Sequence, residues 1–305
     1  MSKILVIRGG AIGDFILTLP VLSALRQQFP KATLEVLGYP HIAQLAVTGG
    51  LADAVRSIEE RPLAGFFARG GILDPDLQEY FAGFAIIISY LYDPDGVFEA
   101  NVRRSCKGQF IAGPHRPDEL KNEHATTVFL EPLKRLAIFD ANVVPRLAFS
   151  QPPPSNRQAN CIAIHPGSGS EKKNWALENW IALARHLLNS SAASLLIIGG
   201  EAESTKIERL KITLAQPSAE FAFNLPLPEL AGRIAACALF IGHDSGITHL
   251  AAASGIPVVA LWGETNAAIW APRGERVSVV KSSAGLKNLG VAAAIAAVNR
   301  QGGFG

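Results

Sequence analysis

The sequence contains little cysteine and almost no net charge. Its 305 residues include three cysteines, Cys106, Cys161 and Cys237, and its formal net charge is +2. The cysteine spacing matches no zinc-binding pattern, and an odd number of cysteines is a poor framework for disulfides. We therefore expect buried thiols, as in proteins of a reducing cytoplasm. The small net charge argues against nucleic acid as a partner.

Long hydrophobic runs are absent as well. No stretch approaches the ~18 consecutive apolar residues that a membrane-spanning helix requires. The N-terminal stretch MSKILVIRGGAIGDFILTLPVL starts like a signal peptide. Arg8 and Asp14 interrupt it, however, and no cleavage site of small residues follows. These absences predict a cytoplasmic protein and leave open a peripheral contact with the cytoplasmic face of the inner membrane.

Several common motifs of nucleotide-binding proteins and hydrolases are missing too. The loop RGGAIGD (8–14) has Arg8 where the dinucleotide fingerprint requires its first glycine. The next predicted strand ends without the acidic residue that holds a ribose. The loop HPGSGSEKKNW (165–175) lacks the Walker A spacing, and the chain contains no G-x-S-x-G. These mismatches disfavour nicotinamide binding and serine hydrolysis.

What the sequence does contain is a regular alternation of apolar runs and amphipathic stretches. Runs of Val, Ile and Leu separated by helical patterns predict parallel sheets covered by helices on both faces. Strands are predicted at 3–8, 32–38, 84–90, 109–113, 161–167, 193–200, 238–242, 257–263 and 276–280. Helices are predicted at 14–29, 124–139, 176–190, 203–215, 227–237, 248–255 and from 291 onward.

The stretch SQPPPSNRQ (150–158) divides this pattern into two halves. Consecutive prolines can continue neither a helix nor a central strand. We therefore predict two doubly wound, Rossmann-like domains, 1–150 and 151–305, facing an interdomain cleft. In such sheets ligands bind beyond the carboxyl ends of the strands. The last helix is a candidate to pack back on the N-terminal domain.

The first loop of interest follows the first predicted strand. Gly10 and Gly13 allow a tight turn that directs Asp14 toward the cleft. Two interpretations of Asp14 remain open. Aspartate is a preferred cap at a helix N-terminus, and it can equally serve as a general base.

Two loops of the second half carry candidate donor-binding residues. HPGSGSEKKNW (165–175) combines exposed backbone N–H groups, hydroxyls and lysines, which suits a phosphate but also describes a polar turn. GGEAES (199–204) places Glu201 and Glu203 just past a strand. There they can accept hydrogen bonds from ribose hydroxyls, or stabilise the N-terminus of the next helix.

The fourth loop begins the stretch GHDSGITHLAAASGIPVVALWG (242–263). Ser245, Gly246, Thr248 and His249 lie where a helix is predicted to start, and helix N-termini bind anions. Asp244 would repel a phosphate, so we expect it to face neutral hydroxyls such as those of a sugar. The alternative is a cap followed by an ordinary turn.

Together these loops resemble glycosyltransferase family 9, which contains the lipopolysaccharide heptosyltransferases. The resemblance lies in IGDxxLxxPxLxxL at 12–25, HPGS…KxW at 165–175 and DSGxxHLAAAxGxPxxxLxG at 244–263. It implies the GT-B architecture and inverting transfer of a heptose from ADP-heptose, without a metal or other cofactor. The N-terminal domain would bind a saccharide or glycolipid acceptor of the lipopolysaccharide-core type, and the C-terminal domain would bind the nucleotide sugar.

The resemblance also implies roles for individual residues. Asp14 would deprotonate the acceptor hydroxyl, and Lys173 would stabilise the departing diphosphate as its charge develops. Asp244 would hold the donor sugar. The other donor contacts would be Ser168, Ser245, Gly246, Thr248 and His249 for the diphosphate, and Glu201 and Glu203 for the nucleoside.

Some features depart from the family pattern. WGET (262–265) stands in place of FGxT, and Gly167-Ser168 stands where relatives carry a pair of hydroxyls. A nucleotide-sugar epimerase, a hydrolase or a non-catalytic binding protein of the same fold therefore remain alternatives.

Two further groups of charged residues need an interpretation. The two DPD triplets, 74–76 and 93–95, are interpreted as helix caps and turns rather than a metal site. The basic residues Arg103, Arg104, Lys107 and Arg116 fit either anionic groups of an acceptor or a solvated helix face.

Overall fold

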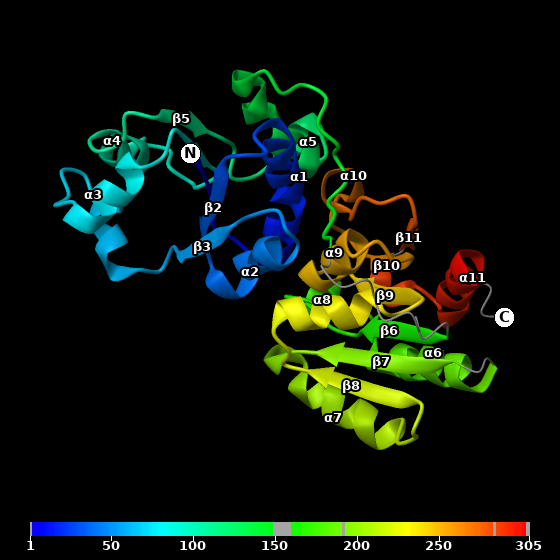
Figure 1. Cartoon of the computed structure of the whole chain (residues 1–305). Coiled ribbons are helices and arrows are strands. Elements are labelled where there is room, and N and C mark those ends of the chain that lie inside the picture. Colours follow the sequence, from blue (N-terminus) through cyan, green and yellow to red (C-terminus); the bar gives the residue numbers. More distant parts are fainter. Residues whose placement is uncertain (1, 149–159, 191–192, 283–284, 303–305) are drawn as a thin grey trace. The chain divides into compact units, whose positions relative to one another are not determined.

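The chain folds into two compact units, Met1–Val143 (unit 1) and Val144–Gly305 (unit 2) (Figure 1). The computed structural model describes residues 2–148, 160–190, 193–282 and 285–302. Each unit contains a parallel sheet, which confirms the predicted α/β class. The Pro-rich stretch 150–158, on which the predicted domain boundary depends, lies outside the described residues, within 149–159.

Unit 1 is built on five parallel strands in the order β3-β2-β1-β4-β5. They are β1 (Lys3–Arg8), β2 (Thr33–Gly38), β3 (Ala54–Ser57), β4 (Ile86–Ser89) and β5 (Gln109–Ala112). The first strand therefore lies in the middle, and the strand order reverses between β1 and β4. The carboxyl ends of such a pair are where ligands of doubly wound sheets bind.

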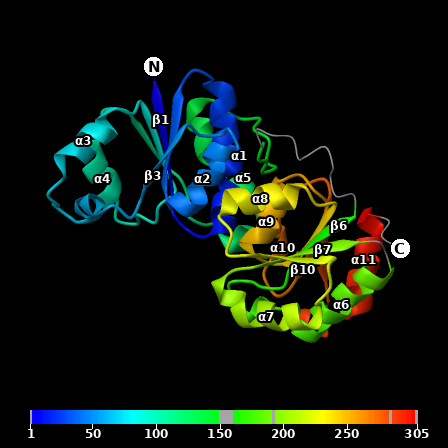
Figure 2. The same ribbon diagram turned by 60° about the horizontal axis from the view of Figure 1, so that its bottom comes forward.

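Helices cover both faces of the unit 1 sheet (Figure 2). One face carries α1 (Ile12–Gln28), α2 (Pro40–Thr48) and α5 (Ala125–Leu130), and the other carries α3 (Pro75–Ala82) and α4 (Val97–Arg103). On the second face Leu5 and Ile7 of β1 share a core with Phe66, Phe81 and Phe98. The alternate residues Ile4 and Val6, also buried, point to the first face.

Two prolines affect the predicted helices of unit 1 differently. α1 continues through Pro20 to Gln28. The helix expected at 124–139 is α-helical only to Leu130 and continues as a 3-10 helix at Glu131–Leu136. Pro132 lies in the first turn of that 3-10 segment, where its missing N–H and its ring oppose a continued α-helix.

Unit 2 contains six parallel strands in the order β11-β10-β9-β6-β7-β8. They are β6 (Cys161–His165), β7 (Ser194–Gly199), β8 (Ala219–Phe223), β9 (Leu239–His243), β10 (Val258–Trp262) and β11 (Val277–Lys281). The strand order reverses between β6 and β9, which pair directly, His165 opposite Gly242. The loops after β6 and β9 thus flank the switch point of this sheet.

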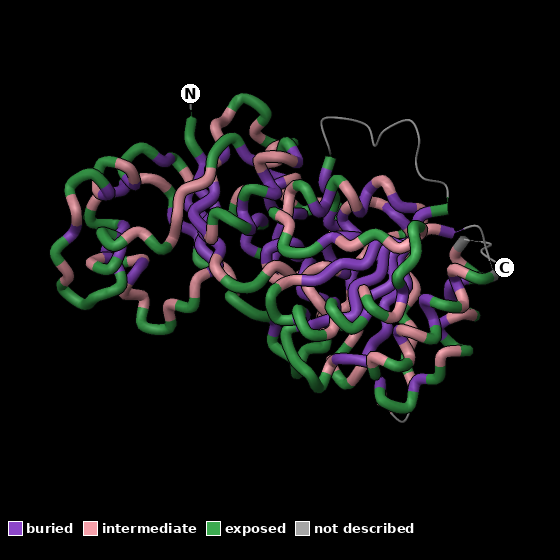
Figure 3. Tube along the Cα trace, turned by 90° about the horizontal axis from the view of Figure 1, so that it is seen from below, coloured by how far each residue is buried: buried purple, intermediate pink, exposed green. Residues whose placement is uncertain are grey.

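The helices of unit 2 also form two layers (Figure 2). One layer is α6 (Leu177–Ser190), α7 (Ser204–Thr213) and α11 (Val291–Gly302), and the other includes α8 (Leu227–Ala235) and α9 (Gly246–Ala253), while α10 (Ala267–Trp270) is a single turn. In α11, Ala294, Ala297 and Val298 are buried in the core of unit 2. Figure 3 shows how the buried trace follows the central strands.

The structure shows where the cysteines and the large aromatic residues lie. All three cysteines are buried free thiols, and the sulfurs of Cys161 and Cys237 lie 3.4 Å apart. The four tyrosines of the chain all belong to unit 1 and its four tryptophans all belong to unit 2. Among the described residues, no helix is both long and apolar enough to span a bilayer.

Candidate active site

The switch point of unit 2 brings together two of the predicted loops. His165 ends β6 and His243 ends β9, so the loop 166–176 and the turn 244–245 start from adjacent strands. The hydroxyl of Ser245, in the turn after β9, lies 3.4 Å from Nδ1 of His165 at the end of β6. Residues 80 positions apart in the sequence therefore form one polar region.

The main feature of this region is an ion pair between Lys173 and Asp244. The ammonium nitrogen of Lys173 lies 2.7 Å from Oδ2 of Asp244. The Asp244 side chain is 11% exposed, whereas that of Lys173 is 40% exposed and reaches solvent. The structure thus brings together the residue expected to bind the diphosphate and the residue expected to bind the sugar. An incoming diphosphate would compete with Asp244 for the same ammonium group.

The hydroxyl groups that were predicted to bind the diphosphate make hydrogen bonds to other residues of unit 2. Ser168 is buried, and its hydroxyl lies 2.8 Å from the carbonyl of Ser170 and 2.9 Å from Oδ1 of Asn174. Ser245 caps α9 by accepting the N–H of Thr248, and the Thr248 hydroxyl donates to the carbonyl of His243.

Two more predicted ligands lie in α9. Gly246 is its first residue and is half-buried, while His249 is buried. The side chains that this region presents to a ligand are therefore Lys173 and Asp244, next to the helix start at Gly246.

The two candidate nucleoside residues differ in their surroundings. Glu203 is buried, accepts the N–H of Gly200 at 3.0 Å, and packs against Gly167. A Cβ added at Gly167 would lie 2.2 Å from Cγ of Glu203, which explains the need for glycine there. Glu201 is exposed and accepts a hydrogen bond from the Asn224 amide at 3.3 Å. Glu201 is therefore the more accessible of the two.

Two buried imidazoles lie beneath this region and are neutral. Burial lowers the pKa of His243 to about 4. Burial also lowers the pKa of His165 to about 3, with smaller contributions from His243 and Lys206. The Lys206 ammonium itself pairs with Glu171 at 2.8 Å, in the same 3-10 turn (Glu171–Lys173) that carries Lys173.

These pKa values predict that the folded protein loses stability in mild acid. An unfolded histidine has a pKa of about 6.5, so between that pH and 4 the unfolded chain binds more protons than the folded one. The free energy of unfolding should therefore fall as the pH drops from 6.5, by about 3 kcal/mol at pH 4 for His243 alone. Urea unfolding between pH 7 and pH 4 measures this fall.

A matched pair of variants isolates the contribution of His243. His243→Gln should make the decline with pH shallower than in the wild type, since glutamine does not titrate. His41→Gln, at an exposed position of unit 1, should leave the decline unchanged. Identical slopes for the wild type and His243→Gln would show that His243 does not contribute.

Unit 1 holds Asp14 at the start of α1, beside the switch point of its own sheet. The helix begins at Ile12, two residues earlier than predicted, so Asp14 occupies the third helical position. Its Oδ2 accepts the N–H of Ala11 at 3.1 Å. The carboxylate therefore stabilises the start of the helix. The Asp14 side chain is also 31% exposed, so a reactant can reach it.

Arg8 is a candidate site residue that the sequence interpretation missed. Its buried guanidinium lies 3.6 Å from Oδ1 of Asp14 and donates to the carbonyl of His115 at 3.0 Å. It also lies over the ring of Phe129, 4.5 Å from the centroid. Arg8 thereby joins the ends of β1 and the segment after β5. The available signal in the sequence was an arginine that directly follows the apolar run ILVI of β1.

A cavity of about 220 Å³ opens at the carboxyl ends of β4 and β5 in unit 1. Its lining is mixed aromatic and polar, and includes Ser89, Tyr92, Asp93, Glu99, Phe110 and His115. Because His115 also accepts from Arg8, the cavity borders the surroundings of Asp14. Such a lining suits a polyhydroxylated ligand.

The DPD triplets serve as the predicted caps. Asp74 accepts the N–H of Leu77 at the start of α3, and Asp93 accepts the N–H groups of Phe98 and Glu99 at the start of α4. Asp95 pairs with Arg69. Within the described residues, no group of three or more His, Cys, Asp or Glu side chains could hold a metal ion.

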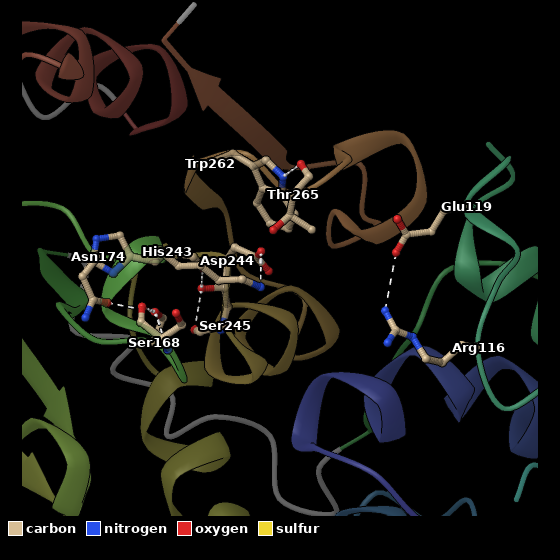
Figure 4. A network of polar contacts seen from close by, with 12 residues as sticks. Arg116, Glu119, Ser168, Asn174, His243, Asp244, Ser245, Trp262 and Thr265 are labelled. Atoms are coloured by element: carbon tan, nitrogen blue, oxygen red, sulfur yellow. Dashed lines mark hydrogen bonds and ion pairs between the residues drawn. The ribbon is translucent and has the colours of Figure 1, made fainter. Parts of the chain in front are cut away.

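Three of the basic residues singled out in the sequence, Arg103, Arg104 and Arg116, have local partners. Arg103 pairs with Glu99, and Arg116 pairs with Glu119 (Figure 4). Arg104 donates to the carbonyl of Gly71. These contacts fit the interpretation as a solvated face.

The chain is similar in sequence and in fold to known glycosyltransferases. The model of glycosyltransferase family 9 (heptosyltransferase) matches residues 134–291, just over half of the chain. Lipooligosaccharide heptosyltransferase 2 of Haemophilus ducreyi is 22% identical over 310 residues, which cover 92% of this chain and 88% of that protein. Among solved structures, the ADP-heptose LPS heptosyltransferase II of E. coli aligns with a TM-score of 0.79 at 15% identity and covers 98% of both chains. E. coli heptosyltransferase WaaC with ADP aligns with a TM-score of 0.78 at 17% identity, covering 98% of this chain and 99% of that chain. The structural likeness supports the GT-B fold.

Proposed function

Because the chain belongs to glycosyltransferase family 9, we propose that it transfers a heptose from ADP-heptose to a saccharide acceptor of the lipopolysaccharide-core type, with inversion at the anomeric carbon. The observation that carries this proposal is the Lys173–Asp244 pair at the switch point of unit 2. A cation beside a carboxylate suits a ligand whose diphosphate is joined directly to a sugar. Two structural relatives, E. coli WaaC with ADP and E. coli ADP-heptose LPS heptosyltransferase II, support the choice of nucleotide.

The donor end of the reaction is assigned to unit 2. Lys173 binds the diphosphate of the donor, and the N-terminal N–H groups of α9 add partial positive charge. Asp244, released from Lys173, accepts hydrogen bonds from the sugar hydroxyls. As the bond from the anomeric carbon to the diphosphate breaks, its electron pair leaves with ADP. The ammonium group then stabilises the growing negative charge, a role that a metal ion fills in other enzymes.

The acceptor end is assigned to unit 1. The acceptor hydroxyl oxygen attacks the anomeric carbon from the face opposite the diphosphate, which inverts the configuration there. Asp14 removes the proton of that hydroxyl as the new bond forms. The cavity beside Arg8 and His115 receives the acceptor sugar, since Tyr92 offers an aromatic surface and Glu99 a hydrogen-bond acceptor.

A nucleotide screen by thermal unfolding tests the donor assignment. ADP at a hundred times its Kd should stabilise the protein by about 2.7 kcal/mol, because only the folded state binds it. UDP and GDP at the same concentration should produce little change. Stabilisation by UDP or GDP but not by ADP would refute the adenine assignment.

A second measurement separates transfer from hydrolysis. ADP release from ADP-heptose should require a core-type saccharide acceptor and should match the amount of glycosylated acceptor formed. Equal ADP release with and without acceptor would identify a hydrolase instead.

A further inference from the structure

His243, to which the sequence analysis assigned no role, connects the two loops of the proposed donor-binding region. His243 is the last residue of β9 and directly precedes Asp244. Its side chain is fully buried, so it meets no ligand itself. Its ring packs edge-on against Trp180 of α6, with 5.0 Å between the ring centroids.

Three hydrogen bonds define the state of this imidazole. Its Nε2 accepts the backbone N–H of Trp175 at 2.9 Å and the indole N–H of Trp180 at 3.2 Å. Two donors aimed at Nε2 require that nitrogen to be unprotonated, so the ring proton resides on Nδ1. Nδ1 then donates to the carbonyl of Gly167 at 3.3 Å.

The partners of the imidazole lie at the two ends of the loop that carries Lys173. Gly167 opens this loop, and Trp175 closes it two residues after Lys173. One ring on β9 therefore fixes both ends of a loop that starts from β6. The loop is held elsewhere by the Ser168–Asn174 and Lys206–Glu171 contacts and by the Trp175 indole N–H, which donates to Leu289.

From this geometry we infer that His243 is a positioning residue for donor binding, because its neutral imidazole holds Lys173 in register with Asp244. The inference rests on the proposed function, which makes Lys173 the ligand of the donor diphosphate. It adds a residue that acts through Lys173 without touching the donor. An aliphatic side chain in its place would leave two N–H groups and a carbonyl without partners, and the loop would shift to satisfy them.

The test is a double-mutant cycle on ADP affinity, measured by calorimetry. His243→Leu should weaken ADP binding about tenfold in the wild-type background. In the Lys173→Ala background the same change should have little further effect, because the group that His243 positions is already absent. His243→Gln, which retains an acceptor and a donor, should recover most of the affinity.

Two controls keep the test decisive. Cys237→Ala alters a buried residue just before β9, away from the loop, and should leave ADP affinity unchanged despite lost stability. If His243→Leu does not fold, His243→Asn takes its place, because its shorter side chain can still donate to Gly167 from near the position of Nδ1 but has no atom at the position of Nε2, where the two tryptophan N–H groups are accepted.

The outcomes separate the inference from the function on which it rests. Unchanged ADP affinity in the His243 variant, or an equal loss with and without Lys173, would overturn the positioning role while ADP binding by the wild type still stood. Failure of the wild type to bind ADP would instead refute the proposed function, and the inference with it.

Discussion

Replacing Asp14 by asparagine should lower kcat for sugar transfer by about 10²–10⁴-fold, while ADP affinity stays at the wild-type value. Asparagine has the same shape, and its amide oxygen can still accept the N–H of Ala11 that Asp14 accepts at 3.1 Å. It cannot take the proton of an acceptor hydroxyl. Steady-state transfer assays and calorimetric titration with ADP measure the two quantities, and full activity in the variant would refute the assignment of the base.

The glycines before Asp14 provide a matched control for this prediction. Gly10 has a positive φ of 99°, and a Cβ there would lie 2.9 Å from Oδ2 of Asp14. Gly10→Ala should therefore displace the carboxylate and lower kcat with it. A Cβ on Gly9 would meet Leu91 at 3.8 Å and Ile58 at 3.9 Å, both ordinary van der Waals contacts, so Gly9→Ala should retain activity. Equal activity of the two variants would show that the position of Asp14 is not critical.

Replacing Lys173 by alanine should weaken ADP binding about 10- to 150-fold. The loss corresponds to one charge-assisted hydrogen bond, which contributes about 1.5–3 kcal/mol. The ammonium group lies 2.7 Å from Asp244, beside the start of α9 where the diphosphate is proposed to bind. Calorimetry with ADP measures the change in Kd.

The neighbouring lysine supplies the control for this variant. Lys172 is exposed and carries the same charge one position earlier. Lys172→Ala changes the net charge of the protein by the same amount, so a general electrostatic effect would weaken ADP binding equally in both variants. Loss of affinity in Lys173→Ala alone supports a direct contact, and unchanged affinity in Lys173→Ala would mean that this lysine faces solvent.

The central strands could be predicted from the sequence because both of their faces are buried. β1, β6 and β9 are nearly continuous apolar runs, and each was located within one or two residues. Of the four edge strands, β5 and β11 were predicted, whereas β3 and β8 were not. Arg56 interrupts β3 and Glu220 interrupts β8, and both strands are partly exposed. A short, partly exposed strand that contains a charged residue leaves a weaker apolar signal in the sequence.

The candidate site was predictable as a set of residues but not as a set of contacts. Asp14, Lys173 and Asp244 stand out through their motifs. That Lys173 meets Asp244 follows from the pairing of β6 with β9, which requires the strand order. His243 precedes Asp244 in the sequence, yet its role depends on Trp175 and Trp180, which are distant in sequence. Local patterns cannot reveal partners that the sheet topology brings together.

Because tyrosine and tryptophan are separated between the two units, the intrinsic spectroscopic signals of the chain can distinguish one unit from the other. With all tryptophans in unit 2 and all tyrosines in unit 1, selectively excited indole fluorescence follows only unit 2. Trp180 donates directly to His243, so its emission is sensitive to the protonation of that imidazole. Near-ultraviolet signals of tyrosine report on the other unit. Unfolding and ligand titrations of the intact, unlabelled protein can thus be resolved unit by unit.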